Sequence, residues 1–309
     1  MLKQLVDQLT VSPLVGVDLG SAAVKLVELT QTGGRLTLHR CAIESIEGKD
    51  PTDVLKRLVS ESGITTSGVV LALASPRLVV KPFEFPAMPK KDLSNAIHLE
   101  AEQSILNGHS LSEIALDWHT FAPSSKETIR GVFSAVPKGV VEARLKTVRA
   151  AGLRPSIVDI EGLALWNAYW TLVGSQEPIL KTVLLLNIGV RTTNVVIAKG
   201  RDALILVRDV QLGAQALGDG HAQDWATEIL DSLGYARSQG GLRALESIYV
   251  TGGGSGPHVI SHLKSISAAP LTFWNPLNQV ERDAHSPPVD EALGPLLAVA
   301  IGLALRQPT

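Results

Sequence analysis

Residues 15–29 of this chain read VGVDLGSAAVKLVEL, and this stretch decides the fold. It predicts a strand that ends near Asp18 and passes through Gly20 into a tight hairpin, with the hydroxyl of Ser21 at the tip. Glycine lets the backbone approach an anion closely, successive N–H groups then point at it, and an aspartate orients the waters of a hydrated cation. The turn therefore has the chemistry to hold terminal phosphates together with magnesium.

A second stretch near the middle of the chain repeats the first. Residues 184–197 read LLLNIGVRTTNVVI, and when the glycines are aligned Asn187 takes the place of Asp18. Both stretches open the same pattern of three strands, expected at 14–19, 24–30 and 35–43 and again at 182–188, 193–199 and 203–210. One half of the chain thus echoes the other, which predicts two similar α/β lobes, and the second copy lacks the acid.

Composition limits what the chain does. Its 309 residues are 45% hydrophobic, as in a globular protein with one large or two medium domains. An aromatic content of 4% and a net charge of −2 argue against a nucleic-acid platform and against attraction to anionic lipid. A single cysteine, Cys41, fits a reducing compartment, and neither a signal peptide nor a membrane-spanning run is recognised. We therefore expect a soluble, cytoplasmic protein without a transmembrane segment.

Between the two strand patterns lies a segment with its own character, residues 76–150. It reads as a strand at 78–85, a helix at 91–105, strands at 113–121 and 128–136, and a helix at 138–151. This β-α-β-β-α order predicts a small unit inserted in the first lobe. The other main elements are expected as helices at 51–62, 163–172, 222–237 and 290–305 and strands at 68–74, 156–160 and 247–250.

A third glycine loop, TGGGSG at 251–256, follows a strand and opens another helix. Bare backbone at the start of a helix suits a flat ring or a phosphate, but such loops also serve close packing. Taken alone, the loop leaves both readings open. The order of the three loops, each after a strand and on successive halves, favours a ligand.

In this order the three loops resemble the phosphate-1, phosphate-2 and adenosine motifs of the superfamily of actin, sugar kinases and heat-shock chaperones. Within it, the chain is similar to the type IV pilus assembly protein PilM family, relatives of the cell-division protein FtsA. The likeness covers nearly the whole chain and includes, beyond the opening motif, FPAMPK at 85–90, AIHLEAEQ at 96–103, AVPK at 135–138, AGLRP at 151–155 and AIGLALR at 300–306.

The resemblance implies an actin-like, ribonuclease H-like α/β fold with two duplicated lobes around a cleft. The expected division is a first lobe from residues 1–75 plus 151–180, a partner-binding inserted subdomain from 76–150, and a shortened second lobe from 181–309. It also implies a component of the inner-membrane platform that assembles type IV pili, held peripherally at that membrane through partners. These are other platform proteins and a PilN-like protein, whose cytoplasmic tail lies in a groove bordered by the inserted subdomain.

Features of the inserted segment suit capture of such a tail. The strand at 78–85 offers backbone groups for pairing, and Ile97, Ala101 and Ile105 give the following helix an apolar face. The alternative is that this face packs against its own sheet.

The resemblance further implies ATP and magnesium in the cleft between the lobes. The expected cofactor-binding residues are Asp18, which would also face the metal, Gly20, Ser21, Lys25, Asn187, Gly189, Thr193, Gly252, Gly253 and Gly254. No catalytic residue is assigned.

Two departures from the family's pattern bear on this cofactor. Asn187 stands where relatives usually carry Asp, so an acceptor remains but the negative charge that helps hold the cation is lost. The distance from Gly189 to Gly252 is also short, which predicts a reduced cleft wall. Together they predict weak nucleotide binding and ATP turnover close to background.

The remaining candidates have ordinary readings beside functional ones. Asp159 and Glu161 follow a strand that returns to the cleft, where relatives position an attacking water; acids at a helix start are the alternative. His258 and His262 lack the Glu and the third ligand of a zinc site. Cys41 in a strand reads as a small core residue. Glu100 and Glu102 lie on opposite sides of a helix, which indicates a side that faces solvent or a partner. The apolar face of Leu2, Leu5, Val6 and Leu9 is expected to pack on its own domain, with docking on a partner or the membrane as the alternative.

Two other functions stay open at this point. A small-molecule kinase on the same fold needs an Asp base and intact phosphate-binding acids, and Asn187 counts against it. A component of a type II secretion or mannose-sensitive pilus system would use the same fold without obligatory nucleotide.

Overall fold

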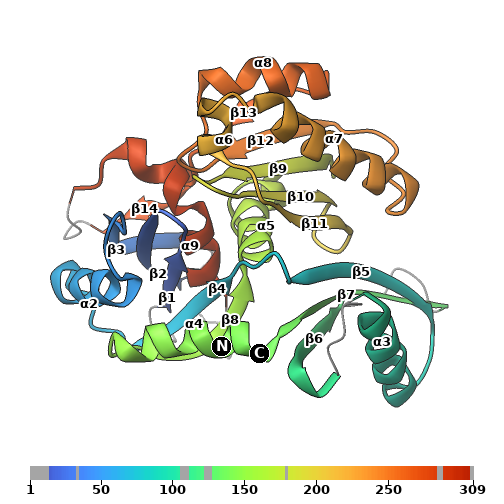
Figure 1. Ribbon diagram of the computed structural model, residues 1–309, viewed down its shortest axis with the longest axis horizontal. Helices are drawn as coiled ribbons and strands as arrows, with labels where there is room; N and C mark the ends of the chain where they lie inside the picture. The colour runs from blue at the N-terminus through green and yellow to red at the C-terminus, as the bar shows by residue number, and fades with distance from the viewer. Residues whose placement is uncertain are drawn as a thin grey trace, which may run out of the picture.

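The computed structural model describes residues 14–32, 35–104, 111–121, 127–177, 180–283 and 288–306. Two larger sheets and one smaller sheet carry helices on their faces (Figure 1). The apolar face expected at residues 2–9 lies outside the described residues, as does Ile105. Among the residues that are described, no helix has the length and apolar character that crossing a bilayer requires.

The first sheet has six strands in the order β14-β3-β2-β1-β4-β8. The first three strands are antiparallel, while β4 pairs parallel with β1 and β8 pairs parallel with β4. A short strand from late in the chain, β14, extends the far edge. The strands are β1 (Leu14–Leu19), β2 (Ala23–Thr32), β3 (Arg35–Ser45), β4 (Gly68–Leu73), β8 (Arg154–Ile160) and β14 (Glu281–Arg282).

Two helices cover one face of this sheet. Helix α2 (Pro51–Ser62) begins where the Asp50 carboxylate accepts a hydrogen bond from the Thr52 backbone N–H at 2.7 Å, and it ends at Gly63. Helix α4 (Lys138–Ala150) joins the same hydrophobic cluster through the buried Val148. The last helix expected in the inserted unit therefore packs on the first lobe.

The second sheet repeats the first. Its order is β11-β10-β9-β12-β13, so β9 to β12 take the places of β1 to β4. The predicted helical face of Trp225, Ile229 and Leu233 is fully buried against it. The elements are β9 (Thr182–Ile188), β10 (Thr193–Lys199), β11 (Leu204–Val210), β12 (Ser247–Thr251), β13 (Leu271–Phe273), α6 (Ala214–Gly218), α7 (Ala222–Ser238) and α8 (Pro257–Ile266).

The third sheet, in the order β5-β7-β6, lies beside the first lobe (Figure 1). Helix α3 packs on it with Ile97 and Ala101 fully buried beside Phe133, so the apolar face expected to take a partner's tail is covered by its own sheet. The edge strand β5 contacts β11 of the second lobe, which leaves β6 as the other edge. The elements are β5 (Val79–Pro86), α3 (Lys90–Ser104), η1 (Leu111–Glu113), β6 (Ile114–Thr120) and β7 (Thr128–Pro137).

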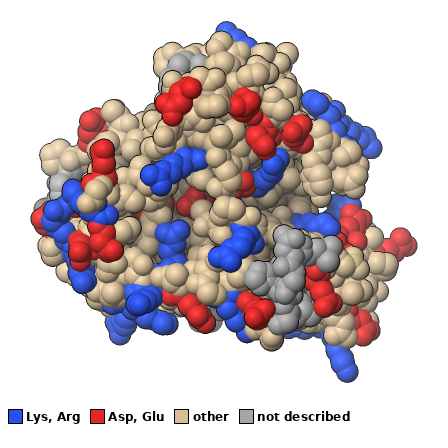
Figure 2. Space-filling model, viewed as in Figure 1, with Lys and Arg blue, Asp and Glu red and all other residues tan. Residues whose placement is uncertain are grey.

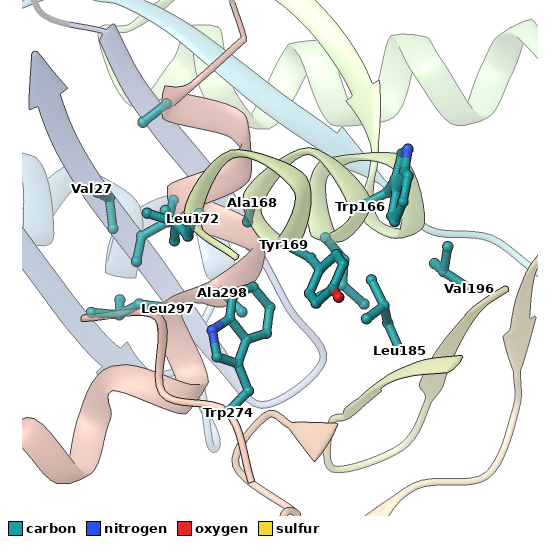
Figure 3. Close-up of a cluster of buried hydrophobic side chains, with 14 of the residues drawn as sticks. Val27, Trp166, Ala168, Tyr169, Leu172, Leu185, Val196, Trp274, Leu297 and Ala298 are labelled. Carbon is teal, nitrogen blue, oxygen red and sulfur yellow. The ribbon is translucent and has the colours of Figure 1, made fainter. Parts of the chain in front are cut away.

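Two buried helices, α5 (Glu161–Leu172) and α9 (Ala298–Ala304), join the lobes. Figure 3 shows α5 at the centre of a hydrophobic cluster, with Val27 on one side and Leu185 and Val196 on the other. A single helix over 290–305 was expected, but Pro295 has no N–H to donate, and a 3₁₀ segment, η4 (Glu291–Leu297), precedes α9. The other short 3₁₀ segments are η2 (Gly174–Gln176) and η3 (Pro276–Gln279).

Candidate functional site

Two hairpin turns and one glycine loop meet at a small cavity between the two large sheets, which we call the cleft. The turn after β1 comes from the first sheet, the turn after β9 from the second, and the loop after β12 closes a third side. The volume of the cavity is about 90 Å³. Because both sheets have the same strand order, their first hairpins face each other across the junction, as the duplication predicts.

The first hairpin carries an ion pair between a buried aspartate and a partly buried lysine. Lys25 lies opposite Asp18 in the strand register, and its ammonium donates a hydrogen bond to the Asp18 carboxylate at 2.7 Å. Burial opposes the charge on Lys25, but the attraction and hydrogen bond of Asp18 outweigh it and raise the pKa of the lysine. The second carboxylate oxygen of Asp18 has no hydrogen-bond partner among the described residues. The Gly20 N–H donates to the Ala23 carbonyl at 3.1 Å and closes the turn.

The second hairpin has the same turn with a neutral pair. The Gly189 N–H donates to the Thr192 carbonyl at 2.9 Å. Asn187 and Asn194 occupy the two register positions, and the Asn187 amide donates to the Asn194 side-chain oxygen at 2.7 Å. Each substitution removes one charge, so the pair stays matched without any net charge.

A buried acidic cluster lies beneath the second hairpin. The Asn194 amide donates to the carboxylates of Glu161 at 3.0 Å and Asp209 at 2.8 Å. Burial, together with the charges of Asp18 and Asp209, raises the pKa of Glu161 to about 7, and burial also raises the pKa of Asp209. Three carboxylates thus lie in this region together with the ammonium of Lys25.

The third loop is tied to the end of η4. The Gly252 N–H and the Thr251 hydroxyl both donate to the Pro295 carbonyl at 3.0 Å. The Gly254 N–H donates to the Ile188 carbonyl at 2.8 Å, which fixes the loop against the second hairpin. The position of this side of the cavity therefore depends on the segment that leads into α9.

The structure brings most of the predicted residues to the cavity. Thr193 does not line it: its side chain is fully buried, its hydroxyl donates to the Leu212 carbonyl at 2.8 Å, and the Trp225 indole N–H donates to it at 3.0 Å. Gly254 does not line it either. The predicted residues that do are Asp18, Gly20, Ser21, Lys25, Asn187, Gly189, Gly252 and Gly253.

Among the lining residues that the sequence did not indicate, Asn194 has the most direct sequence signal. Asn194 follows Asn187 by seven residues, as Lys25 follows Asp18, and aligning the two hairpins over their full length would have identified it. Of the two acids left undecided, Glu161 faces this cavity and Asp159 does not.

The cavity does not fit a whole nucleotide in this arrangement. Sites for ligands of that size have volumes of about 300 Å³ or more, against about 90 Å³ here. The free oxygen of Asp18 suits one water of a hydrated cation. Among the residues that the structure describes, no group of three His, Cys, Asp or Glu side chains is placed to hold a metal directly.

A larger groove of about 350 Å³ lies between the first lobe and the third sheet. Its walls include β8, the last strand of the first sheet, and β6, the edge strand of the third. Apolar side chains from the first lobe and from the inserted segment line it, among them Leu78, Val158 and Leu163. A cavity of this shape has room for an extended peptide, and strand edges offer it backbone hydrogen bonds.

One buried acid lies in this groove. Asp159 accepts the Ile160 N–H at 2.8 Å and pairs with the Arg306 guanidinium, whose nitrogen lies 3.5 Å from the other carboxylate oxygen. Burial raises the pKa of Asp159, and the positive charge of Arg306 opposes that shift.

The other candidates are not part of either cavity. Glu100 pairs with Lys81, and Glu102 is exposed. Burial raises the pKa of the Cys41 thiol, which disfavours the thiolate that a nucleophile needs.

The chain was compared with known families and solved structures. The family model described as type IV pilus assembly protein PilM matches residues 16–229. The chain is similar to a chain of the PilM–PilN type IV pilus biogenesis complex, at 23% identity over 97% of this chain and 100% of that chain, with a TM-score of 0.81. This likeness shows that the fold is actin-like.

Two more distant structures were also matched. One is the ethanolamine utilization protein EutJ from Carboxydothermus hydrogenoformans, with 14% identity over 94% of this chain and 88% of that chain and a TM-score of 0.50. The other is the cytoplasmic domain of EpsL, an inner-membrane component of the type II secretion system of Vibrio cholerae. Its identity is 15% over 94% of this chain and 95% of that chain, with a TM-score of 0.48.

Proposed function

Because this chain belongs to the type IV pilus assembly protein PilM family, we propose that it is an actin-like scaffold of the pilus assembly platform that works through its groove. The groove holds the cytoplasmic tail of a PilN-like membrane protein as an extended segment between β6 and β8. The observation that carries this proposal is the groove itself, with about 350 Å³ of volume, a lining of both apolar and polar side chains, and two strand edges.

The charge of the surface supports attachment through a partner. On the face that Figure 2 shows, basic and acidic side chains are interspersed rather than gathered by sign, and the net charge is −2. Attraction to anionic lipid by charge alone is therefore weak. We place the protein in the cytoplasm, peripheral at the inner membrane, where it also contacts other platform proteins.

The proposed division of the chain follows the sequence-based one. Residues 1–75 with 151–180 form the first lobe, 76–150 the inserted subdomain that borders the groove, and 181–309 the second lobe, from which β14 returns to pair with the first sheet. Deleting 76–150 would also remove Val148 from the cluster of the first lobe, so point substitutions test the groove more cleanly.

The cleft is proposed to bind Mg-ATP weakly and to turn it over close to background. The neutral pair at Asn187 and Asn194 and the small cavity support this. A small-molecule kinase would need room for two substrates, and we do not propose one. A phosphate-release assay tests the claim; turnover at about 1 per second or faster, the range of ordinary enzymes, would contradict it.

The groove is tested with a synthetic peptide that copies the tail of the PilN-like partner. Ala115 lines the groove from β6, so Ala115→Glu places a charge against apolar side chains and is expected to weaken peptide binding at least about tenfold. Leu99→Asp is the matched control, because Leu99 lies on α3, is 57% exposed and is outside the groove. Fluorescence anisotropy gives both affinities; equal loss or no loss in the two variants would reject the groove.

A further inference from the structure

We propose that the groove and the cleft are coupled, so that a peptide bound in the groove changes the arrangement of the loops around the cleft, and the reverse. The inference rests on the proposed function of the groove. Two connections between the cavities carry it: the junction of β8 with α5, and the segment formed by η4 and α9.

The first connection is only three residues long. Asp159 lines the groove and Glu161 lines the cleft, and both side chains are buried. Ile160 lies between them as the residue that caps α5, and its N–H donates to the Asp159 carboxylate. A rotation of the backbone at Asp159 therefore changes where Glu161 meets Asn194 of the second hairpin.

The second connection runs along α9. At its C-terminal end, Arg306 lines the groove and pairs with Asp159. At the other end, the Pro295 carbonyl holds Gly252 and Thr251, and Leu296 lines the cleft. The continuous stretch of residues 295–306, which contains α9, thus reaches the cleft at one end and the groove at the other.

The packing of α9 makes it a stiff link. All its residues from Ala298 to Ala304 are buried. A β-carbon added to Gly302 would lie 1.9 Å from the Ala164 carbonyl oxygen of α5, and one added to Gly16 of β1 would lie 2.0 Å from the Ala300 carbonyl oxygen. Backbones in such close contact have no soft side chains between them to absorb a displacement, so motion at one end reaches the other.

The two states differ first in the contact between Arg306 and Asp159, and the other changes follow from it. Without a peptide, the Arg306 guanidinium pairs with Asp159 while its side chain remains 47% exposed. A peptide that fills the groove competes for the Asp159 carboxylate and displaces Arg306, since all three would occupy the same cavity. When this pair is broken, the end of α9 is released. Pro295 then shifts together with Gly252 and Thr251, which donate hydrogen bonds to its carbonyl.

Amide hydrogen exchange measures the coupling without any nucleotide. The full chain is compared with and without the synthetic tail peptide, and exchange in the loops at 187–193 and 251–255 is expected to change about fivefold or more. In Arg306→Gln this change is expected to be lost. Arg154→Gln is the matched control, because Arg154 lies at the opposite end of β8 and hydrogen-bonds the Ser67 hydroxyl; it should leave the change intact.

The reverse direction gives a second readout. Glu161 does not line the groove, yet Glu161→Gln is expected to change the affinity for the peptide about fivefold or more. The control is Glu28→Gln, a buried glutamate outside both cavities that accepts the Thr66 hydroxyl. If the peptide binds but neither readout changes, the coupling is wrong and the proposed function stands. If the peptide does not bind, both are wrong.

Discussion

The two hairpins that face the cleft share one backbone conformation, but they differ in the charge of their cross-strand pair. In both, a glycine N–H closes the turn on the carbonyl three residues later. In both, the cross-strand pair seven residues apart is hydrogen-bonded at 2.7 Å. The first pair, Asp18 with Lys25, is ionic, and the second, Asn187 with Asn194, is neutral.

The difference shows which part of a duplicated site depends on function. The turn is set by the strand register, so it persists wherever the fold persists. The charges are needed only if an anion and a cation must be held. The second hairpin therefore keeps the shape of the turn, but its cross-strand pair offers amide groups and no carboxylate to a cation.

The largest expected effect comes from breaking the ionic pair. Asp18→Ala leaves the partly buried ammonium of Lys25 without its hydrogen-bonded partner, which should lower the free energy of unfolding by about 3 kcal/mol. Asn187→Ala breaks a neutral pair and should cost about 1 kcal/mol. Urea unfolding compares the two, and equal costs would show that the charges make no energetic difference.

The free energy of unfolding is expected to depend on pH through Glu161, which lies between the two hairpins. Its pKa in the folded protein, about 7, lies above the ordinary 4.5, so its contribution to stability is greatest at low pH and is lost as pH rises through 7. Glu161→Gln removes this loss. The variant should match the wild type at about pH 4, below the ordinary pKa, and exceed it at pH 8 by up to about 3 kcal/mol. Glu102→Gln, at an exposed position, is the control in the same unfolding series, and an unchanged pH profile in Glu161→Gln would refute the raised pKa.

Replacing Asn187 with aspartate gives the second hairpin the carboxylate that the first hairpin has. Asn187→Asp adds a carboxylate near Asp18 and Glu161, so the variant without metal should be about 1 kcal/mol less stable. With magnesium the added charge holds the cation, and Mg-ATP affinity should rise about tenfold. Calorimetric titration with and without magnesium checks both signs. A variant that binds Mg-ATP no better than the wild type would mean that the missing charge is not what weakens the site.

The smallest effect is expected at Thr193. Its counterpart in the first hairpin is the buried Val24, so valine fits this place in the fold. Thr193→Val leaves the Trp225 indole N–H without its acceptor and should cost about 1 kcal/mol in thermal unfolding, with no change in ligand affinity. Thr193→Ser keeps the hydroxyl and serves as the control. A drop in Mg-ATP affinity in Thr193→Val alone would show that the Thr193 hydroxyl contributes to ligand binding in the cleft.

Much of the fold could be predicted because short stretches of sequence determine most of its strands and helices. The strands at 182–188 and 193–199 and the helix at 51–62 have the predicted bounds. Alternating apolar residues and turn glycines set these elements within a few residues of chain. The pairing of Asp18 with Lys25 also follows from the length of the hairpin.

Other features depend on contacts between distant segments, which a pattern does not encode. Residues 138–151 read correctly as a helix, but only the tertiary packing of Val148 reveals that it covers the first lobe. The ion pair of Asp159 with Arg306 joins a strand end to the end of the last helix. The hydrogen bond from the Asn194 amide to the Glu161 carboxylate joins the second lobe to the first. Residues of this kind form most of the groove and the base of the cleft.

The central claim is that the chain works through its groove and not through its cleft. The most direct measurement is photo-crosslinking of the full chain with the tail peptide of the PilN-like partner, followed by mass spectrometry of the linked residues. The account predicts crosslinks to β6 and β8 around Ala115 and Val158, which line the groove. Crosslinks to the hairpin turns at Gly20 and Gly189, with the groove unlabelled, would contradict it.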